Sequence, residues 1–298
     1  MSRRILVTGS TGLLGQAVVA VARARGHAVT GIARSGADRA VDIADDAALA
    51  ATFAETKPDV AINTAAAVNL DACEADPAMA WRVNARAVQV LGEIVDGAGA
   101  KLVQISTDHF FTGGGSRKHG ETAPVTILNE YARTKLAAER IATQWPGALV
   151  LRTNLVGFRG WAGRPSFTEW VIATLASGTP MTLFADVFTS SIDVRTFAAA
   201  ALDLVDRDAA GVLNLASREV YSKQAFIEAL ARRLGLSLAA TSPGTVRELA
   251  TRRAESMGLD VSAAEKILGY RLPGLADVID SLAAEYATRK EGTCATTM

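Results

Sequence analysis

The chain has 298 residues, of which 49% are hydrophobic and 21% are charged. Lys plus Arg and Asp plus Glu number 31 each, so the chain lacks the net charge that would favour a nucleic acid or an anionic membrane as a partner. No apolar run approaches the ~20 residues that span a bilayer, the N-terminus lacks a signal-peptide pattern, and Cys73 and Cys294 have no metal-ligand spacing. We therefore expect a cytoplasmic protein that binds no membrane, nucleic acid or metal.

A glycine-rich turn follows the first apolar run of the chain. Residues 5–8 favour a strand, Gly9, Gly12 and Gly15 follow at G-x-x-G-x-x-G spacing, and residues 16–25 favour a helix. Glycines between a strand and a helix allow a tight turn and let the backbone approach a pyrophosphate at the helix N-terminus. The alternative is a purely structural turn. We favour a dinucleotide site.

Further strand-like runs alternate with helical stretches. The runs cover residues 28–33, 60–63, 102–106 and 149–152, and the main helices between them cover residues 78–96 and 129–144. This alternation predicts an α/β fold with a doubly wound, Rossmann-type parallel sheet, in which ligands bind at the carboxyl ends of the strands.

The end of the second strand bears on the choice of cofactor. An NAD site usually has an acidic residue there, whereas this strand ends in Arg34 and Ser35. A guanidinium and a hydroxyl suit a 2′-phosphate, so we predict NADPH rather than NADH, although Arg34 as a solvated loop residue is the alternative. Asp42 and Ile43 lie after the next loop, where they are placed to contact the adenosine, and small residues at Ala65 and Ala66 would let a dinucleotide cross the strand end.

The candidate catalytic residues follow the fourth strand and begin the next helix. Thr107 lies just past residues 102–106, and Tyr131 and Lys135 lie one helical turn apart, on one face. A free tyrosine titrates near ~10, and we expect the Lys135 ammonium to lower the pKa of Tyr131 so that the phenol works as an acid. The alternative is an ordinary amphipathic helix edge. Tyr131 is the predicted proton donor and Thr107 the predicted partner of a substrate carbonyl.

The second half of the chain is less regular. We expect residues 1–157 to form the dinucleotide-binding domain and residues 158–287 a smaller, mostly helical substrate lobe. Within that lobe, residues 187–215 contain a strand and helix that return to the main sheet. Residues 288–298 are polar and are predicted to be a disordered tail.

Four motifs together resemble the extended short-chain dehydrogenase/reductases, and most closely the dTDP-4-dehydrorhamnose reductase family. They are Gly9-x-x-Gly12-x-x-Gly15, Asn63-Thr64-Ala65-Ala66, Ser106-Thr107-Asp108 and Tyr131-x-x-x-Lys135, in the family's order. The resemblance implies reduction of a 4-keto nucleotide sugar, with Thr107 orienting the carbonyl, Tyr131 delivering the proton and Lys135 binding the nicotinamide ribose. A homodimer is compatible with this resemblance.

The resemblance and the motifs together give two sets of ligand contacts. The predicted cofactor contacts are Gly9, Thr11, Gly12, Leu13, Leu14, Arg34, Ser35, Asp42, Ile43, Ala65, Ala66, Tyr131 and Lys135. The predicted substrate contacts are Thr107, Asp108, His109 and Asn154. Two departures from the family pattern flank the sugar pocket, because His109 stands where the family has tyrosine and Leu155 where it often has tryptophan.

Two alternative functions stay open. One is a cofactor-binding regulatory subunit that resembles that of methionine adenosyltransferase, and the other is a nucleotide-sugar epimerase or dehydratase. The intact Thr107, Tyr131 and Lys135 favour an enzyme over the regulatory subunit. A dehydratase commonly carries acidic residues after its hydroxyl residue, which Asp108 fits and His109 does not, so a reductase is preferred.

Overall fold

A parallel sheet of seven strands forms the centre of the computed structural model, which describes residues 2–248 and 253–295. The strand order is β11 (Gly211–Asn214), β6 (Leu149–Arg152), β5 (Lys101–Ile105), β4 (Val60–Asn63), β1 (Arg4–Thr8), β2 (Ala28–Ala33) and β3 (Arg39–Ala40). All neighbouring pairs are parallel. The order reverses at β1, because β2 lies on one side of it and β4 on the other. This confirms the predicted doubly wound sheet and places its ligand crevice between β1 and β4.

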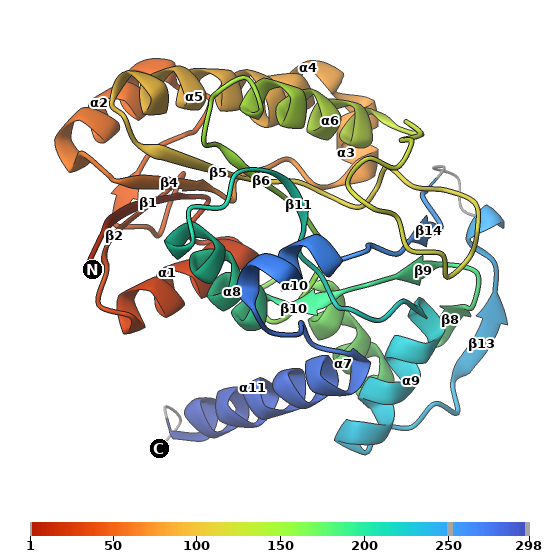
Figure 1. Ribbon diagram of the computed structural model, residues 1–298. Helices are drawn as coiled ribbons and strands as arrows, with labels where there is room; N and C mark the ends of the chain where they lie inside the picture. Colours follow the sequence, from red (N-terminus) through yellow and green to blue (C-terminus); the bar gives the residue numbers. More distant parts are fainter. Residues whose placement is uncertain (1, 249–252, 296–298) are drawn as a thin grey trace.

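Helices cover both faces of the sheet (Figure 1). The upper layer in Figure 1 contains α2 (Asp46–Thr56), α5 (Ala87–Gly97) and α6 (Glu130–Ala142), and the lower layer contains α1 (Leu13–Ala24), α8 (Val194–Asp206) and α10 (Ser262–Leu268). Within β1, Leu6 packs into the core cluster of the upper layer, whereas Ile5 and Val7 pack into that of the lower layer. Both faces of the strands are therefore buried, which explains their continuous apolar sequences.

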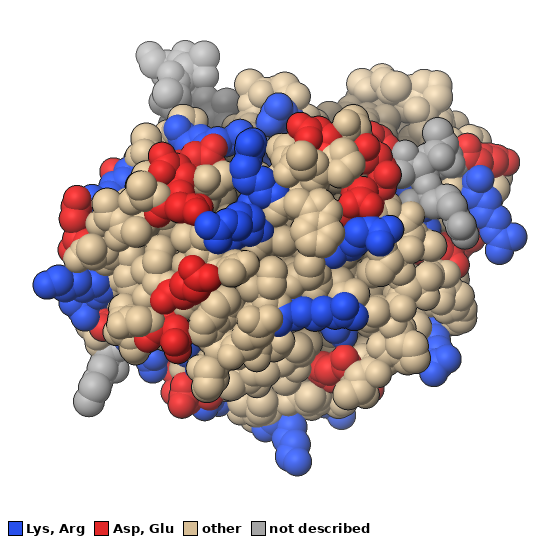
Figure 2. All heavy atoms as spheres, turned by 90° about the horizontal axis from the view of Figure 1, so that it is seen from above, with Lys and Arg blue, Asp and Glu red and all other residues tan. Residues whose placement is uncertain are grey.

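The outer surface of the upper layer carries charges of both signs. Figure 2 shows acidic and basic side chains interspersed among uncharged ones over this face, without one extended patch of a single sign. The even distribution agrees with the equal numbers of acidic and basic residues. Within the described residues, no helix is both long and apolar enough to cross a membrane.

A π-helical turn interrupts the connection from β4 to α5. The chain passes through α3 (Leu70–Ala75), α4 (Pro77–Trp81) and the π-turn η1 (Arg82–Arg86). Asn84, in this turn, is buried; its Oδ1 accepts a hydrogen bond from Ala67 N at 2.8 Å, and its Nδ2 donates to Thr134 Oγ1 at 3.0 Å. Asn84 therefore ties the loop after β4 to helix α6.

The second lobe packs around a separate hydrophobic cluster. Its helices are α7 (Phe167–Ser177), α9 (Lys223–Leu234) and α11 (Leu275–Ala295). Its short strands form three small sheets: β7 (Leu155–Val156) with β10 (Ile192–Asp193), β9 (Phe188–Thr189) with β12 (Tyr221–Ser222) and β14 (Ser256–Met257), and β8 (Met181–Phe184) with β13 (Thr241–Gly244). A 3-10 turn, η2 (Val246–Glu248), follows β13. Between these elements the chain returns to the main domain, where α8 packs on α1 and β11 pairs with β6.

The end of α11 differs from the sequence expectation. A disordered tail was expected from residue 288, but the helix continues to Ala295. The guanidinium of Arg289 lies 5.5 Å from the centre of the Phe158 ring and donates to the Phe158 carbonyl at 3.2 Å, so it attaches this end of the helix to the lobe. The expectation is therefore wrong for residues 288–295, and residues 296–298 lie outside the described residues.

Candidate active site

The glycine-rich turn after β1 has a geometry that only glycine satisfies. Gly9 has φ +65°, and a Cβ there would lie 2.8 Å from Ala65 Cα. A Cβ on Gly15 would lie 2.1 Å from the Gly9 carbonyl oxygen. Gly12 caps α1 without a side-chain hydrogen bond, so no side chain of this cap takes up the amides of the first helical turn. These amides and the missing side chains fit the pyrophosphate of a dinucleotide.

The predicted cofactor contacts divide into exposed and buried groups. Arg34, Ser35 and Asp42 are exposed in the connections beyond β2. Leu14 and Ile43 have side chains in the hydrophobic core, so Leu14 faces a ligand only through its backbone. The remaining contacts belong to three segments, with Gly9, Thr11, Gly12 and Leu13 in the turn after β1, Ala65 and Ala66 in the loop after β4, and Tyr131 and Lys135 on α6.

Helix α6 brings Tyr131 and Lys135 together with Thr107. The helix starts after Asn129, whose Oδ1 accepts a hydrogen bond from Ala132 N at 2.8 Å and so fixes the first turn. Tyr131 is 8% exposed and Lys135 is 3% exposed. Thr107 follows β5 and hydrogen-bonds with the Tyr131 side chain. The three predicted catalytic residues thus lie at one end of the sheet, on the side of its carboxyl edge.

The pKa of Tyr131 moves in the direction opposite to that expected. Burial raises the pKa of Tyr131 to about 12, and the hydrogen bond with Thr107 only partly offsets this. The Lys135 ammonium points elsewhere, because its Nζ donates to the Ile105 carbonyl at 2.7 Å. Burial also lowers the pKa of Lys135 to about 8. The expectation that Lys135 lowers the pKa of Tyr131 is therefore wrong for this arrangement, because desolvation of the phenolate is the largest cause of the shift and Lys135 is not among its causes.

The predicted substrate contacts surround Tyr131 with unsatisfied polar atoms. Asp108 is fully buried; its Oδ2 accepts from Asn154 Nδ2 at 2.9 Å, whereas its Oδ1 has no hydrogen-bond partner among the described residues and lies 4.0 Å from His109 Nε2. Burial raises the pKa of Asp108 to about 7. The His109 ring stands perpendicular to Tyr131, with centroids 5.5 Å apart, and its Nδ1 also lacks a partner in this part of the chain. Because burial lowers the pKa of His109 to about 4, the imidazole is neutral at pH 7.

Asn154 links this cluster to the second lobe. Its Oδ1 accepts from Ser191 Oγ at 2.7 Å while its Nδ2 holds Asp108. Tyr221 OH donates to the Ser191 carbonyl at 2.6 Å. The carboxylate beside the phenol is therefore oriented by residues from both lobes, so that a rearrangement of the second lobe would move Asp108.

Comparison with known proteins identifies the family. The RmlD substrate binding domain family matches residues 3–287. The chain belongs to this family. It is 32% identical over 292 residues to the probable low-salt glycan biosynthesis reductase Agl14 of Haloferax volcanii, covering 94% of this chain and 97% of that protein. It is also 30% identical over 290 residues to the dTDP-4-dehydrorhamnose reductase of Burkholderia thailandensis, covering 91% and 94% of the two chains.

A solved structure shows the same fold. The dTDP-4-dehydrorhamnose reductase of Bacillus anthracis, in complex with NADP, superposes with a TM-score of 0.86 at 20% identity, covering 96% of this chain and 100% of that one. The resemblance drawn from the four motifs is thus confirmed. So is the prediction that the chain is an NAD(P)-dependent reductase of the RmlD family.

Two residues near the site in this RmlD-family protein were not predicted from its sequence. Glu139 lies one turn beyond Lys135 on α6, accepts from Ser106 Oγ at 2.6 Å and pairs with Arg152 at 2.8 Å. Lys223, at the start of α9, interacts electrostatically with Asp108, and burial lowers its pKa. The spacing of Tyr131, Lys135 and Glu139 on one helix was a usable signal for Glu139. No signal was available for Lys223, which is far from the motifs in sequence.

Among the described residues, the structure has no group of three or more His, Cys, Asp or Glu side chains that could hold a metal ion.

Proposed function

We propose that this protein is an NADPH-dependent reductase of a 4-keto nucleotide sugar. The observation that carries the proposal is the arrangement at Tyr131, where a buried phenol lies among Thr107, Asp108 and His109, two of which present polar atoms without a partner. Buried polar atoms are normally satisfied, so these atoms mark a place where a polar ligand completes the hydrogen bonds. A sugar supplies the hydroxyls and the carbonyl that such a place requires.

Each residue has a role that follows from its environment. With a pKa of about 12, Tyr131 stays protonated at neutral pH and can donate its proton to a carbonyl oxygen. Thr107 hydrogen-bonds with this phenol and holds the carbonyl oxygen beside it. Bound NADPH supplies the hydride to the carbonyl carbon. Lys135, one turn beyond Tyr131 on α6, is proposed to hold the nicotinamide ribose of the cofactor with its ammonium.

Asp108, His109 and Asn154 are proposed to hold the sugar. A neutral imidazole and a carboxylate that titrates near neutral pH recognise hydroxyl groups better than they recognise a charged ligand. His109 and Leu155 replace the aromatic residues of the family pattern, so this pocket selects its sugar with an imidazole and an aliphatic side chain. The sugar is therefore proposed to differ in shape from dTDP-4-dehydrorhamnose while keeping the keto group.

The preference for NADPH is supported by the loop after β2. Arg34 and Ser35 directly follow the strand. A site for NADH, which lacks the 2′-phosphate, usually has an acidic side chain at this position. Both residues are exposed at the carboxyl end of β2, so both are accessible to a ligand that lies across the sheet edge.

The test is reduction of a panel of 4-keto nucleotide sugars by purified protein, followed through the absorbance of NADPH. We expect Tyr131→Phe to lose about 10²–10⁴-fold in kcat while it still binds NADPH. Tyr270→Phe is the matched control, because Tyr270 is an exposed tyrosine that bonds Asp203. Undiminished turnover by Tyr131→Phe would remove the proposed acid. NADPH binding without reduction of any sugar would favour the regulatory subunit instead.

A further inference from the structure

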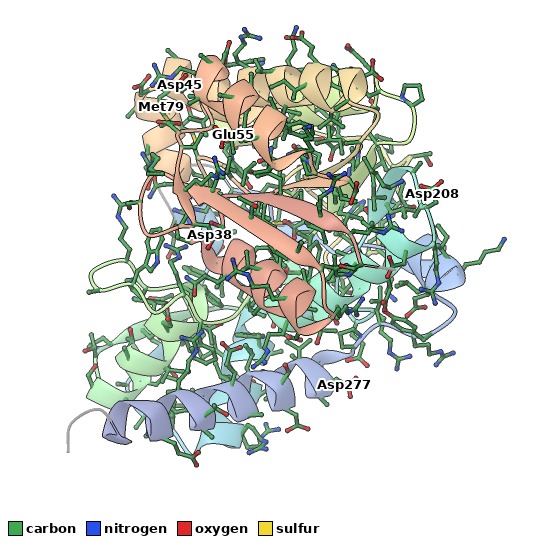
Figure 3. All side chains as sticks on the ribbon, turned by 90° about the vertical axis from the view of Figure 1, so that its left-hand side faces the viewer. Asp38, Asp45, Glu55, Met79, Asp208 and Asp277 are labelled. Atoms are coloured by element: carbon green, nitrogen blue, oxygen red, sulfur yellow. The ribbon has the colours of Figure 1, made fainter. Side chains whose placement is uncertain are left out.

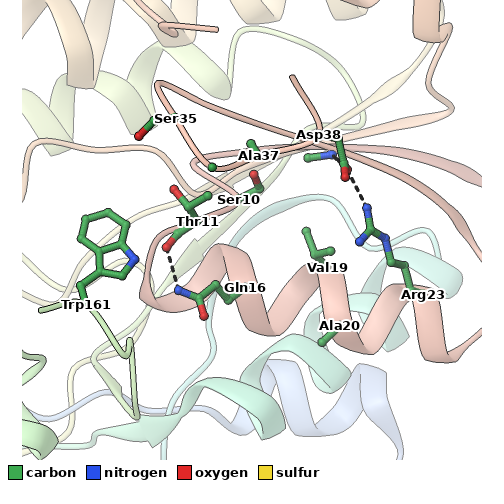
Figure 4. Close-up of a pocket in the computed structure, with 12 residues that line it drawn as sticks. Ser10, Thr11, Gln16, Val19, Ala20, Arg23, Ser35, Ala37, Asp38 and Trp161 are labelled. Carbon is green, nitrogen blue, oxygen red and sulfur yellow. Dashed lines mark hydrogen bonds and ion pairs between the residues drawn. The ribbon is translucent and has the colours of Figure 1, made fainter. Parts of the chain in front are cut away.

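Lys223 is a half-buried cation without a partner of opposite charge in the described part of the chain. Other charges of this protein are paired closely. Asp38, beside the sheet in Figure 3, lies 2.6 Å from the Arg23 guanidinium, and Figure 4 shows this pair. The Nζ of Lys223 makes neither an ion pair nor a hydrogen bond with any described residue. An ammonium that loses water normally gains acceptors in exchange, so this one is placed to receive them from a ligand.

The position of Lys223 is fixed by its surroundings in the second lobe. It is the first residue of α9, and its backbone N donates to the Val187 carbonyl at 2.8 Å. The preceding Ser222 caps the helix, because its Oγ accepts from Ala225 N at 3.0 Å. The Nζ lies 4.8 Å from the centre of the Phe167 ring. Backbone, cap and ring together hold the ammonium in one place.

The segment that carries Lys223 also reaches Asp108 through a chain of hydrogen bonds. Tyr221 OH donates to the Ser191 carbonyl at 2.6 Å, and Ser191 Oγ donates to Asn154 Oδ1 at 2.7 Å. Asn154 Nδ2 then donates to Asp108 Oδ2 at 2.9 Å. Lys223, two residues after Tyr221, interacts electrostatically with the same carboxylate without forming an ion pair with it. The two charges therefore face each other across a gap.

The second oxygen of Asp108 lacks a hydrogen-bond donor. Its Oδ1 is buried without a hydrogen-bond partner among the residues that the structure describes, and it lies 4.0 Å from the Nε2 of His109, which is neutral at pH 7. The protonated Tyr131 also faces this carboxylate, and Arg253 acts electrostatically on both Lys223 and His109. A single hydroxyl group can serve both unsatisfied groups, because it donates one hydrogen bond and accepts another.

We propose that Asp108 and Lys223 together hold the 3-hydroxyl of the keto sugar, which donates to Asp108 Oδ1 and accepts from Lys223 Nζ. Asp108 directly follows Thr107 and faces Tyr131, the two residues proposed to hold the carbonyl oxygen, so the hydroxyl belongs to a carbon next to the carbonyl. In a 4-keto hexopyranose this carbon is C3, since C5 bears the ring oxygen. The inference rests on the proposed reductase function. It makes Lys223 a specificity-determining residue and restricts the substrates to keto sugars that keep a hydroxyl beside the ketone.

The first test requires no sugar. The pKa of Asp108 is measured in the free protein by carbon-13 NMR of its carboxyl group, with Asp108→Asn to assign the signal. Because the Lys223 ammonium lowers the pKa of Asp108, Lys223→Met should raise it. An unchanged pKa in Lys223→Met would show that the two groups do not face each other, and it would overturn the proposal whether or not the protein reduces a sugar.

The matched control for both tests is Lys290→Met. The Nζ of Lys290 also lies 4.8 Å from the centre of an aromatic ring, that of Tyr286. It lies on the C-terminal part of α11, which extends away from α9 in Figure 1. We expect Lys290→Met to leave the pKa of Asp108 as in the wild type.

The second test compares the 4-keto nucleotide sugar that the protein reduces with the 3-deoxy analogue of that sugar. We expect kcat/KM of the wild type to be about 10–100-fold higher for the sugar with the hydroxyl, as for a hydrogen bond to charged groups. Lys223→Met should reduce this ratio roughly tenfold, and Lys290→Met should retain it. The ratio separates lost recognition from damage to the fold, because damage lowers both rates together.

The outcomes of the second test distinguish the two proposals. Equal kcat/KM values for the two sugars in the wild type, or an undiminished ratio in Lys223→Met, would refute the role of Lys223 and leave the reductase function intact. Reduction of no sugar at all would remove the proposed function, and this inference with it.

Discussion

The ion pair between Glu139 and Arg152 gives the sharpest prediction about stability. Both side chains are buried, with 4% and 7% exposed, and Arg152 donates to Glu139 through Nε at 2.9 Å and NH2 at 2.8 Å. Ser106 Oγ donates to the same carboxylate at 2.6 Å. The change that isolates this charge is Glu139→Gln, which keeps the size of the side chain.

The expected loss follows from leaving Arg152 charged and buried. Removing one partner of a buried pair destabilises a protein by about 3–5 kcal/mol, because the remaining ion cannot regain its hydration. An amide still accepts one hydrogen bond from Arg152, so we place Glu139→Gln near the lower end, at about 3 kcal/mol. For a chain of this length, that corresponds to a fall in Tm of roughly 5–10 °C.

Urea unfolding at pH 7 measures this loss directly, through the midpoint and the slope. The double variant Glu139→Leu with Arg152→Met removes both charges and should recover most of the stability, because an apolar pair of similar volume often replaces a buried ion pair without loss. A loss below about 1 kcal/mol in Glu139→Gln, with an unchanged slope, would refute the reasoning that Arg152 depends on this carboxylate.

Three further predictions concern the site itself. Because burial lowers the pKa of Lys135 to about 8, kcat/KM for reduction should fall as the pH rises through about 8, and a pH–rate profile of Lys135→Arg should lack that fall. Gly15→Ala, whose Cβ would lie 2.1 Å from the Gly9 carbonyl oxygen, should weaken NADPH binding at least about tenfold in a calorimetric titration, whereas Gly97→Ala, where the space is open, should not. The folded-state pKa of Asp108 is raised to about 7 from 3.8, so its contribution to stability is complete below about pH 4 and is lost as the pH rises through 7. The free energy of unfolding of Asp108→Asn, measured in urea, should therefore rise relative to that of the wild type by on the order of 3 kcal/mol between pH 4 and pH 8. The same pH dependence of unfolding in the two proteins would contradict this.

The sequence predicts the fold well where local signals are strong. The glycine-rich turn, the alternation of apolar strands with helices, and the spacing of Tyr131 and Lys135 each depend on residues close together in the chain, and the structure has all three. The tail was mispredicted because its polar composition conceals the contact between Arg289 and the distant Phe158. Composition alone does not show which residues a helix end reaches.

The charge environment of the site was less predictable for the same reason. The pKa of Tyr131 depends on how completely its neighbours, Cys73 and Ala80 among them, exclude water, which no spacing on α6 reveals. Asp38 lies only a few residues past β2, but its pairing with Arg23 requires the chain to fold back through Gly36 at φ +68°. Lys223 reaches the site from another lobe.

Helix α6 connects the chemistry of the site to the stability of the fold. Tyr131, Lys135 and Glu139 follow one another at intervals of four residues, so one helical face carries the phenol, the ammonium and the anchor to Arg152. A shift of this helix would break the buried ion pair, and the energy of that pair therefore resists any displacement of Tyr131 from Thr107. The ion pair near the C-terminus of α6 thus helps to keep Tyr131, in the first turn of the helix, in place. A proton donor that is already held in position favours catalysis, because the site need not rearrange during the reaction.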